Sequence, residues 1–166
     1  MDVVQYPSPV LKAPTDLVAD PADVAGEIEA MVRIMHEHKG VGLAANQVGI
    51  GKRFFIMNVD GRPGKDVVLV NPQILEGRGN ATAVEGCLSL PGLEMKVKRF
   101  EWVRVRATTL DGQEIELEGD GLFARCVQHE CDHLDGKLIV DRVSPVTRIT
   151  LRPRLKELEK KFKAKA

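Results

Sequence analysis

Two histidines four residues apart, with a glutamate directly after the first, are the residues of this sequence best suited to chemistry. They are His129, Glu130 and His133. Residues four apart on an α-helix lie on the same face, so both imidazoles can reach one metal ion. Glu130 is rotated by about 100° from His129 around such a helix. Its carboxylate then lies beside the metal, where a general base for a metal-bound water is needed.

A catalytic metal site with an open position requires at least one further protein ligand. Cys87 is the best candidate, because it follows Gly86 in a turn-like stretch of the chain. Two imidazoles and one thiolate leave a divalent metal with net positive charge, which lowers the pKa of a bound water. An attacked carbonyl also needs hydrogen-bond donors for its developing oxyanion. The Gln47 side-chain amide and a backbone N–H near Cys87 are the candidates.

The composition indicates one globular domain spanning residues 1–166, long enough to bury a sizeable core. No apolar run approaches the roughly 20 residues of a membrane-spanning helix. The N-terminus lacks the basic and apolar regions of a signal peptide. We therefore expect a cytoplasmic protein without membrane contact, and a monomer. The cysteines are too few for a disulfide framework; they are Cys87, Cys126 and Cys131.

The net charge of zero conceals an asymmetry between the body and the end of the chain. Residues 148–166 carry eight Lys and Arg against two Glu, a net charge of +6, so residues 1–147 carry −6. A basic tail on an acidic body points to an anionic partner, most often nucleic acid.

Periodicity and turn residues predict an α+β fold, in which short, mostly antiparallel sheets pack around a central metal-binding helix. The expected helices are Pro21–His38, Leu122–Asp135 with Asp120 as its N-cap, and Arg154–Lys163 after a break at Pro153. The expected strands are Phe54–Val59, Val67–Val70 ended by Asn71-Pro72, a hairpin of Trp102–Thr109 with Glu114–Glu118, and Leu138–Asp141.

For several His and Cys residues, an exposed or structural role is as good an interpretation as a functional one, or a better one. His36 and His38 lie two apart, cannot share a helical face, and are expected to be exposed at a helix C-terminus. Cys131 lies two residues from each metal-binding histidine, faces away from them and is expected to be structural. Cys126 follows the same helical face as His129, so a substrate pocket and the protein core are equally good placements.

Three stretches together resemble the signature of the peptide deformylase family, in the same order along the chain. They are Gly40-x-Gly42-Leu43-Ala44-Ala45-x-Gln47, Glu85-Gly86-Cys87-Leu88-Ser89 and Gln128-His129-Glu130-x-Asp132-His133. The resemblance extends over nearly the whole chain. It implies an enzyme that removes the formyl group from the initiator N-formylmethionine of nascent polypeptides and releases formate.

The resemblance also implies a role for individual residues. Cys87, His129 and His133 match the metal ligands, Glu130 the acid/base, and Gln47 and the Leu88 backbone N–H the oxyanion donors. The implied metal is Fe²⁺, with Zn²⁺, Ni²⁺ or Co²⁺ as alternatives. The substrate peptide would pair with backbone near Gly42 and Gly86. Residues expected to line the slot for the methionine side chain are Val41, Leu88, Leu122 and Cys126.

The basic tail resembles the C-terminal helix by which some members dock on the ribosome. Two other functions are compatible with parts of the sequence. A zinc endopeptidase would use the His-Glu-x-x-His motif alone, but this sequence lacks a distal His or Glu ligand pattern and offers Cys87 instead. A metal-stabilised RNA-binding domain would use the tail, but a purely structural site is normally closed by four protein ligands.

Overall fold

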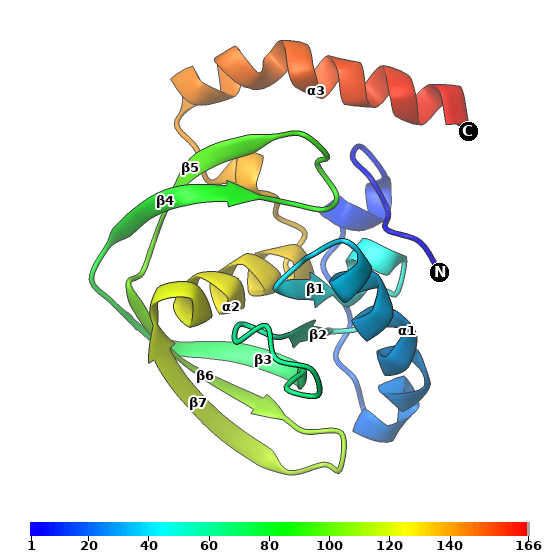
Figure 1. The fold of residues 1–166 in the computed structure, drawn as a ribbon, viewed down its shortest axis with the longest axis vertical. Coiled ribbons are helices and arrows are strands. Elements are labelled where there is room, and N and C mark those ends of the chain that lie inside the picture. Colours follow the sequence, from blue (N-terminus) through cyan, green and yellow to red (C-terminus); the bar gives the residue numbers. More distant parts are fainter. Residues whose placement is uncertain (166) are drawn as a thin grey trace.

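Helix α2 (Gly121–Leu134) runs through the middle of the molecule, between two antiparallel sheets (Figure 1). The computed structural model describes the backbone of residues 1–165 and the side chains of residues 1–164. The other α-helices are α1 (Ala25–Glu37) and α3 (Pro145–Lys165), and short 3₁₀ helices include Ala45–Val48 and Ile139–Asp141. The predicted α+β class, with antiparallel sheets around a central helix, is confirmed.

The larger sheet has the strand order β1-β2-β3-β6-β7, and every neighbouring pair is antiparallel. Its strands are β1 (Gly42–Ala44), β2 (Phe54–Met57), β3 (Val67–Arg78), β6 (Trp102–Thr108) and β7 (Glu114–Asp120). Alternate residues of β6 are buried, as expected for a sheet with one face against the core. The predicted β6–β7 hairpin is confirmed, with Trp102 opposite Asp120 and Thr108 opposite Glu114.

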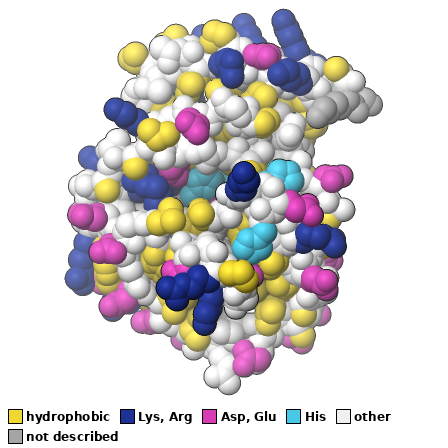
Figure 2. Space-filling view, viewed as in Figure 1, with side chains coloured by type: hydrophobic (Ala, Val, Ile, Leu, Met, Phe, Trp, Pro, Cys, Tyr) yellow, Lys and Arg dark blue, Asp and Glu magenta, His cyan; other side chains and the backbone are white. Residues whose placement is uncertain are grey.

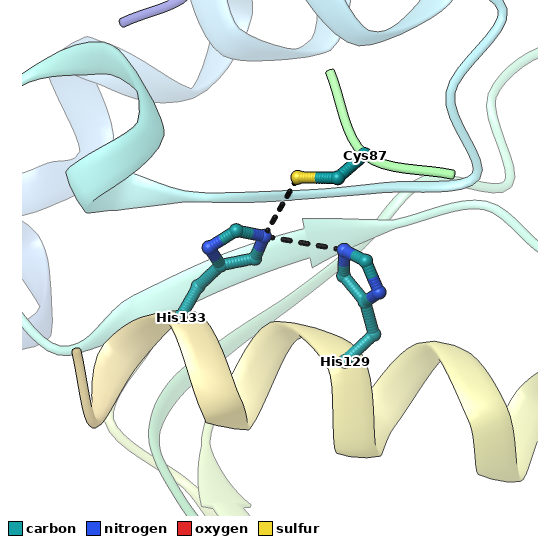
Figure 3. Close-up of side chains that lie close together, drawn as sticks. All are labelled: Cys87, His129 and His133. Atoms are coloured by element: carbon teal, nitrogen blue, oxygen red, sulfur yellow. Dashed lines mark hydrogen bonds between the residues drawn. The ribbon is translucent and has the colours of Figure 1, made fainter. Parts of the chain in front are cut away.

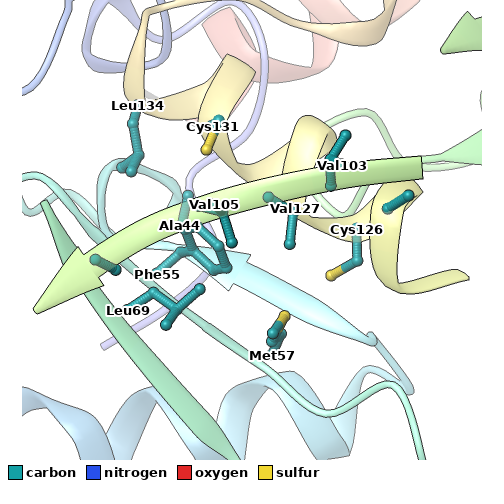
Figure 4. Packing of buried hydrophobic residues seen from close by; sticks show 12 residues of the cluster. Ala44, Phe55, Met57, Leu69, Val103, Val105, Cys126, Val127, Cys131 and Leu134 are labelled. Carbon is teal, nitrogen blue, oxygen red and sulfur yellow. The ribbon is translucent and has the colours of Figure 1, made fainter. Parts of the chain in front are cut away.

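The buried face of this sheet packs against α2 and forms the main core (Figure 4). Phe55 and Leu69 from the sheet belong to one apolar cluster with Val127 and Leu134 from the helix, and all four are fully buried. Cys131 belongs to the same cluster, which confirms its structural reading. A second apolar cluster joins α1 to the edge of the sheet at β1 and β2. The helix that carries the candidate site is therefore fixed along its whole apolar side.

The smaller sheet pairs β4 (Ala81–Gly86) with β5 (Glu94–Arg99) on the other side of α2 (Figure 1). The sequence analysis did not identify β5, although Met95 and Val97 alternate with exposed residues in it. A third apolar cluster fills the space between this sheet and α3, with Leu151, Leu155 and Leu158 packed against its edge.

The prediction that Asn71-Pro72 ends a strand is wrong, because β3 continues to Arg78. The pairing of β3 with β6 shifts register between Val70 and Gln73, so Asn71 and Pro72 form a bulge within the strand. Asn71 has φ +50°, a conformation that Asn tolerates better than most residues. Its side chain accepts a hydrogen bond from Val18 N and donates one to Val18 O, both at 2.9 Å, which stabilises the bulge.

Two predictions for the C-terminal third are also wrong. Residues Ile139–Asp141 form a 3₁₀ turn rather than a strand, because the Asp141 carboxylate accepts a hydrogen bond from Leu138 N and closes the segment locally. The C-terminal helix predicted at about residues 148–166 is confirmed for the residues that the structure describes, but the predicted break is wrong, because α3 begins at Pro145 and contains Pro153. Proline has no backbone N–H, so α3 lacks one hydrogen bond at Pro153. The apolar contacts of Leu151 and Leu155, on either side of Pro153, offset the free-energy cost of that loss.

Smaller differences concern the helix ends. The predicted Pro21–His38 helix is a 3₁₀ turn followed by α1. Asp120 makes no capping hydrogen bond at α2; Gly121, with φ +54°, turns the chain from β7 into the helix instead. Among the described residues, no helix has the length and apolar character needed to span a membrane.

Candidate metal centre and active site

The predicted metal ligands lie close together (Figure 3). The Nε2 atoms of His129 and His133 are 3.1 Å apart, and Cys87 Sγ lies 3.3 Å from His133 Nε2. His129 and His133 project from one face of α2, whereas Cys87 follows the end of β4. A turn closed by the hydrogen bond from Leu90 N to Cys87 O holds the cysteine over the helix.

These three donor atoms fit a small divalent ion. Tetrahedral sites with metal–nitrogen bonds of about 2.1 Å and metal–sulfur bonds of about 2.3 Å separate nitrogen pairs by roughly 3.4 Å and nitrogen–sulfur pairs by roughly 3.6 Å. The His129–His133 and Cys87–His133 spacings are a few tenths of an ångström shorter, and all three donor atoms lie within 4.8 Å of one another. Burial and the neighbouring His129 hold the pKa of His133 well below its usual range, which keeps this ring in the neutral form that binds metals.

Glu130 lies beside the ligand cluster and is buried, with 3 % of its surface exposed. Burial raises the pKa of Glu130 to about 7, a value suited to proton transfer near neutrality. Its Oε2 atom has no hydrogen-bond partner among the described residues. A buried carboxylate oxygen without a partner is costly in a purely structural role, so it points to a ligand or a reacting group.

Gly42 allows this close arrangement of β1 and α2. A Cβ atom at Gly42 would lie 2.6 Å from Glu130 Oε1 and 2.8 Å from Cys126 Sγ. Both distances are shorter than side-chain contacts allow, so only glycine fits. Gly86 differs, because a Cβ atom there would meet its nearest neighbour, Glu94 Cγ, at 3.7 Å. The packing of the described residues thus requires a glycine at 42 and leaves space at 86.

Gln47 presents its amide nitrogen to the site. Its Oε1 accepts a hydrogen bond from Ala44 N at 3.0 Å, and this fixes which end of the amide faces inward. Nε2 lies 3.6 Å from Cys87 Sγ and 3.2 Å from Ser89 Oγ. The backbone N–H of Leu88 donates to no atom of the described residues. Two N–H donors therefore lie close to the candidate ligands.

A buried ionic network binds the Nδ1 side of His129, which faces away from the other two candidate ligands. Glu85 Oε1 accepts a hydrogen bond from His129 Nδ1 at 2.8 Å, and Arg99 binds both oxygens of Glu85 at 2.7 and 3.0 Å. Arg99 also donates to Asp132 at 2.8 Å. Burial raises the pKa of Glu85, but the hydrogen bonds from His129 and Arg99 outweigh it and hold that pKa at about 2. Glu85 is therefore an anion that orients the imidazole.

The sequence analysis named Glu85 only as part of a motif and missed Arg99 and the pairing with Asp132. One feature of the sequence could have identified Arg99 as a buried ionic residue. Arg99 continues the buried register of Met95 and Val97 along β5, and an arginine in an apolar register requires a buried anionic partner.

A cavity of about 880 Å³ opens beside the ligand cluster. All six residues expected from the sequence to contact substrate line it; they are Val41, Gly42, Gly86, Leu88, Leu122 and Cys126. Cys126 also belongs to the main core, so it lies between the core and the cavity. Burial raises the pKa of its thiol well above the usual value, which keeps it neutral. The lining further includes His38 and Arg125.

His36 and His38 lie at the end of α1 and are exposed, as expected. His36 Nε2 contacts Asp66 at 2.7 Å, and His38 Nδ1 contacts Ile34 O at 2.9 Å. Neither joins the ligand cluster.

Comparison with known proteins identifies the family. The polypeptide deformylase family model matches residues 1–149. The chain is 40 % identical over 168 residues to a peptide deformylase of Thermodesulfovibrio yellowstonii, covering 99 % of this chain and 98 % of the relative. It is 43 % identical over 162 residues to that of Alkalilimnicola ehrlichii, covering 95 % of this chain and 90 % of the relative.

Solved structures agree with this assignment. The crystal structure of Arabidopsis thaliana peptide deformylase 1B matches with a TM-score of 0.95 and 35 % identity, covering 100 % of this chain and 94 % of that one. The peptide deformylase of Legionella pneumophila matches with a TM-score of 0.89 and 36 % identity, covering 99 % and 98 %. Peptide deformylases remove the N-formyl group from nascent chains. The chain belongs to the polypeptide deformylase family.

Proposed function

We propose that this chain hydrolyses the N-formyl group of the initiator formylmethionine on nascent polypeptides and releases formate. One observation carries the proposal most strongly. A Cys/His/His cluster, a buried carboxylate oxygen of Glu130 without a partner, and the amide of Gln47 converge beside one cavity. This combination supplies ligands, a base and an oxyanion donor for attack on a carbonyl.

Each residue has a defined part in the reaction. Glu130 takes a proton from the attacking water and delivers it to the amine nitrogen as the carbon–nitrogen bond breaks. The Gln47 amide and the Leu88 N–H donate to the formyl oxygen as it gains negative charge. Glu85 holds His129 in position through its Nδ1 hydrogen bond.

Cys87, His129 and His133 would hold one divalent metal per chain. When bound, such an ion supplies a Lewis acid that polarises the formyl carbonyl and acidifies water. We propose Fe²⁺ as the physiological ion, with Zn²⁺, Ni²⁺ and Co²⁺ as functional substitutes. One thiolate with two imidazoles is a donor set compatible with all four ions.

The cavity suits an extended peptide. Gly86 ends β4, whose partner in the smaller sheet is β5 alone, and Gly42 begins β1 across the cavity. Substrate backbone would pair with these two segments. The methionine side chain would enter the slot lined by Val41, Leu88, Leu122 and Cys126.

Helix α3 is a candidate contact with the ribosome. The Lys and Arg side chains of α3 up to Lys163 are exposed on the outer surface of the molecule (Figure 2), and ribosomal RNA is an anionic surface. Docking there would bring the cavity close to the emerging substrate. With this substrate we infer a cytoplasmic location, and we propose that one chain, residues 1–166 as a single domain, acts as a monomer.

Formate release tests the proposal. The purified chain, loaded with Fe²⁺ under anaerobic conditions, should release formate from N-formyl-Met-Ala-Ser and leave N-acetyl-Met-Ala-Ser intact. The acetylated peptide controls for general amidase activity. Cleavage of internal bonds in unblocked peptides, without formate release, would favour an endopeptidase instead.

A further inference from the structure

Arg125 lines the main cavity one helical turn beyond the ligand cluster. It precedes His129 by four residues on α2, which corresponds to roughly 6 Å along the helix axis. Cys126 and Leu122 line the same cavity on the same helix. A side-chain slot that begins at the ligands and follows α2 toward its N-terminus therefore reaches Arg125.

The guanidinium of Arg125 is held rigidly by three hydrogen bonds. Nη1 donates to Glu85 Oε2 at 2.8 Å and to Val97 O at 3.0 Å, and Nη2 donates to Ala81 O at 2.9 Å. Arginine has five N–H donors, so two have no protein partner among the described residues. The side chain keeps 14 % of its surface exposed. A fixed cation with spare donors thus forms part of the slot wall.

Arg125 shares its carboxylate partner with a second arginine of a buried ionic network. Glu85 is shared between Arg99 and Arg125, and Asp132 is shared between Arg99 and Arg142. Three guanidinium groups therefore face two carboxylates in this ionic network. A hydrogen-bond acceptor that enters the slot can bind an N–H group of Arg125 that has no protein partner among the described residues, whereas an apolar end gains nothing from that group.

We propose that Arg125 determines specificity at the end of the side-chain slot, a proposal that rests on the deformylase function above. Its guanidinium favours unbranched side chains of methionine's length that carry a hydrogen-bond acceptor at the position of the sulfur. Peptides that begin with N-formyl-methionine sulfoxide belong to this class, because the sulfoxide oxygen is a strong acceptor. The enzyme therefore accepts oxidised as well as unoxidised formylmethionine.

The test compares three peptides that differ only in their first residue. They are N-formyl-Met-Ala-Ser, its methionine sulfoxide analogue, and N-formyl-norleucine-Ala-Ser, in which a methylene replaces the sulfur. The measured quantity is the ratio of kcat/KM for the sulfoxide peptide to that for the norleucine peptide. Both values come from one preparation, so metal loading and the active fraction cancel. Arg125→Leu should lower this ratio about tenfold, the usual effect of losing a hydrogen bond to a charged donor.

Arg142→Leu is the matched control. It removes a guanidinium from the same ionic network, but Arg142 does not line the main cavity, so the ratio should stay at the wild-type value. Arg125→Lys retains the charge with shorter reach and should give an intermediate ratio, which keeps the test usable if the leucine variant fails to fold.

Two results would overturn the inference: equal ratios in the wild type and the Arg125 variants, or an equal fall in Arg142→Leu. In both cases formate release from N-formyl-Met-Ala-Ser would still support the proposed function. Absence of formate from that peptide would contradict the proposed function itself.

Discussion

Glu85 Oε1 lies 2.8 Å from His129 Nδ1, so a buried carboxylate anchors the ring nitrogen that faces away from Cys87 and His133. Two arginines, Arg99 and Arg125, bind the same carboxylate. This arrangement fixes which nitrogen of His129 faces the ligand cluster. Control of ligand orientation through such outer contacts is worth about 10–100-fold in metal affinity in other proteins.

Replacing Glu85 by Gln should therefore weaken metal binding about 10–100-fold, as measured by competition with a chelator. Glu94→Gln is the matched control, because Glu94 lies exposed on the same two-stranded sheet. The Glu85→Gln variant also leaves Arg99 and Arg125 without the negative charge of Glu85, so its melting temperature should fall. Unchanged metal affinity in Glu85→Gln would show that the contact has no role in holding the ion.

Gly42→Ala tests the close approach of α2 to β1. The new methyl group would collide with Glu130 Oε1 and Cys126 Sγ, and overpacking of this kind costs about 1–3 kcal/mol. Stability measured in urea should fall by that amount, and formate release should fall because Glu130 is displaced. Gly26→Ala is the control, since a Cβ atom there meets nothing within 4 Å; that change in α1 should stabilise by about 0.5–1 kcal/mol.

Tyr6 connects α3 to the N-terminal segment by donating a hydrogen bond to Glu159 Oε1 at 2.8 Å. Burial and this carboxylate raise the pKa of Tyr6 from 10.0 to about 12. Because the pKa of Tyr6 is higher in the folded state, its protonated phenol stabilises the fold. This stabilisation is fully present below about pH 10 and is lost as the pH rises through 12.

Tyr6→Phe should thus lower the melting temperature by about 2–4 °C at pH 8, and the difference from the wild type should shrink toward pH 12. Melting curves of both proteins across this range provide the measurement. A difference that stays constant from pH 8 to pH 12 would exclude the phenol hydrogen bond as its cause.

The role of α3 can be tested without disturbing its packing. Lys156, Lys160 and Lys163 are exposed, so their replacement by Gln removes charge while Leu155 and Leu158 stay in place. Binding to ribosomes should weaken and become less sensitive to salt, because fewer counterions are released. Turnover of small formyl peptides should not change.

The control replaces Lys52, Lys65 and Lys137, which are exposed elsewhere on the molecule, and causes the same change in net charge. Equal losses of ribosome binding in the two triple variants would show that overall charge, and not α3, governs the interaction.

The elements that carry strong local signals were predictable from the sequence. Alternation identified the β6–β7 hairpin, and the spacing of His129 and His133 identified α2. The structure brings Cys87 to these histidines from 42 residues earlier in the chain, counted to His129. Spacing alone could not predict that contact. The turn-like context of Gly86-Cys87 made Cys87 the best candidate, and the resemblance of three motifs also implied it.

The errors arose where tertiary contacts override local signals. Asn71-Pro72 is a strong strand terminator by itself, but the side chain of Asn71 binds Val18 from a distant segment and the strand continues. Pro153 is a helix breaker by itself, but leucines on both sides of it pack onto the third apolar cluster. The pairing of Arg99 with Glu85 and Asp132 joins β5, β4 and α2, and no local pattern specifies such a triple contact.

Glu130→Gln tests the central claim most directly, because the account assigns the proton transfers to that carboxylate. The variant should bind one metal ion per chain, as the wild type does, since none of the three ligands is changed. Formate release from N-formyl-Met-Ala-Ser by the metal-loaded variant should fall at least about 100-fold, the usual contribution of general acid–base catalysis. Wild-type turnover by a fully metal-loaded Glu130→Gln enzyme would contradict the account.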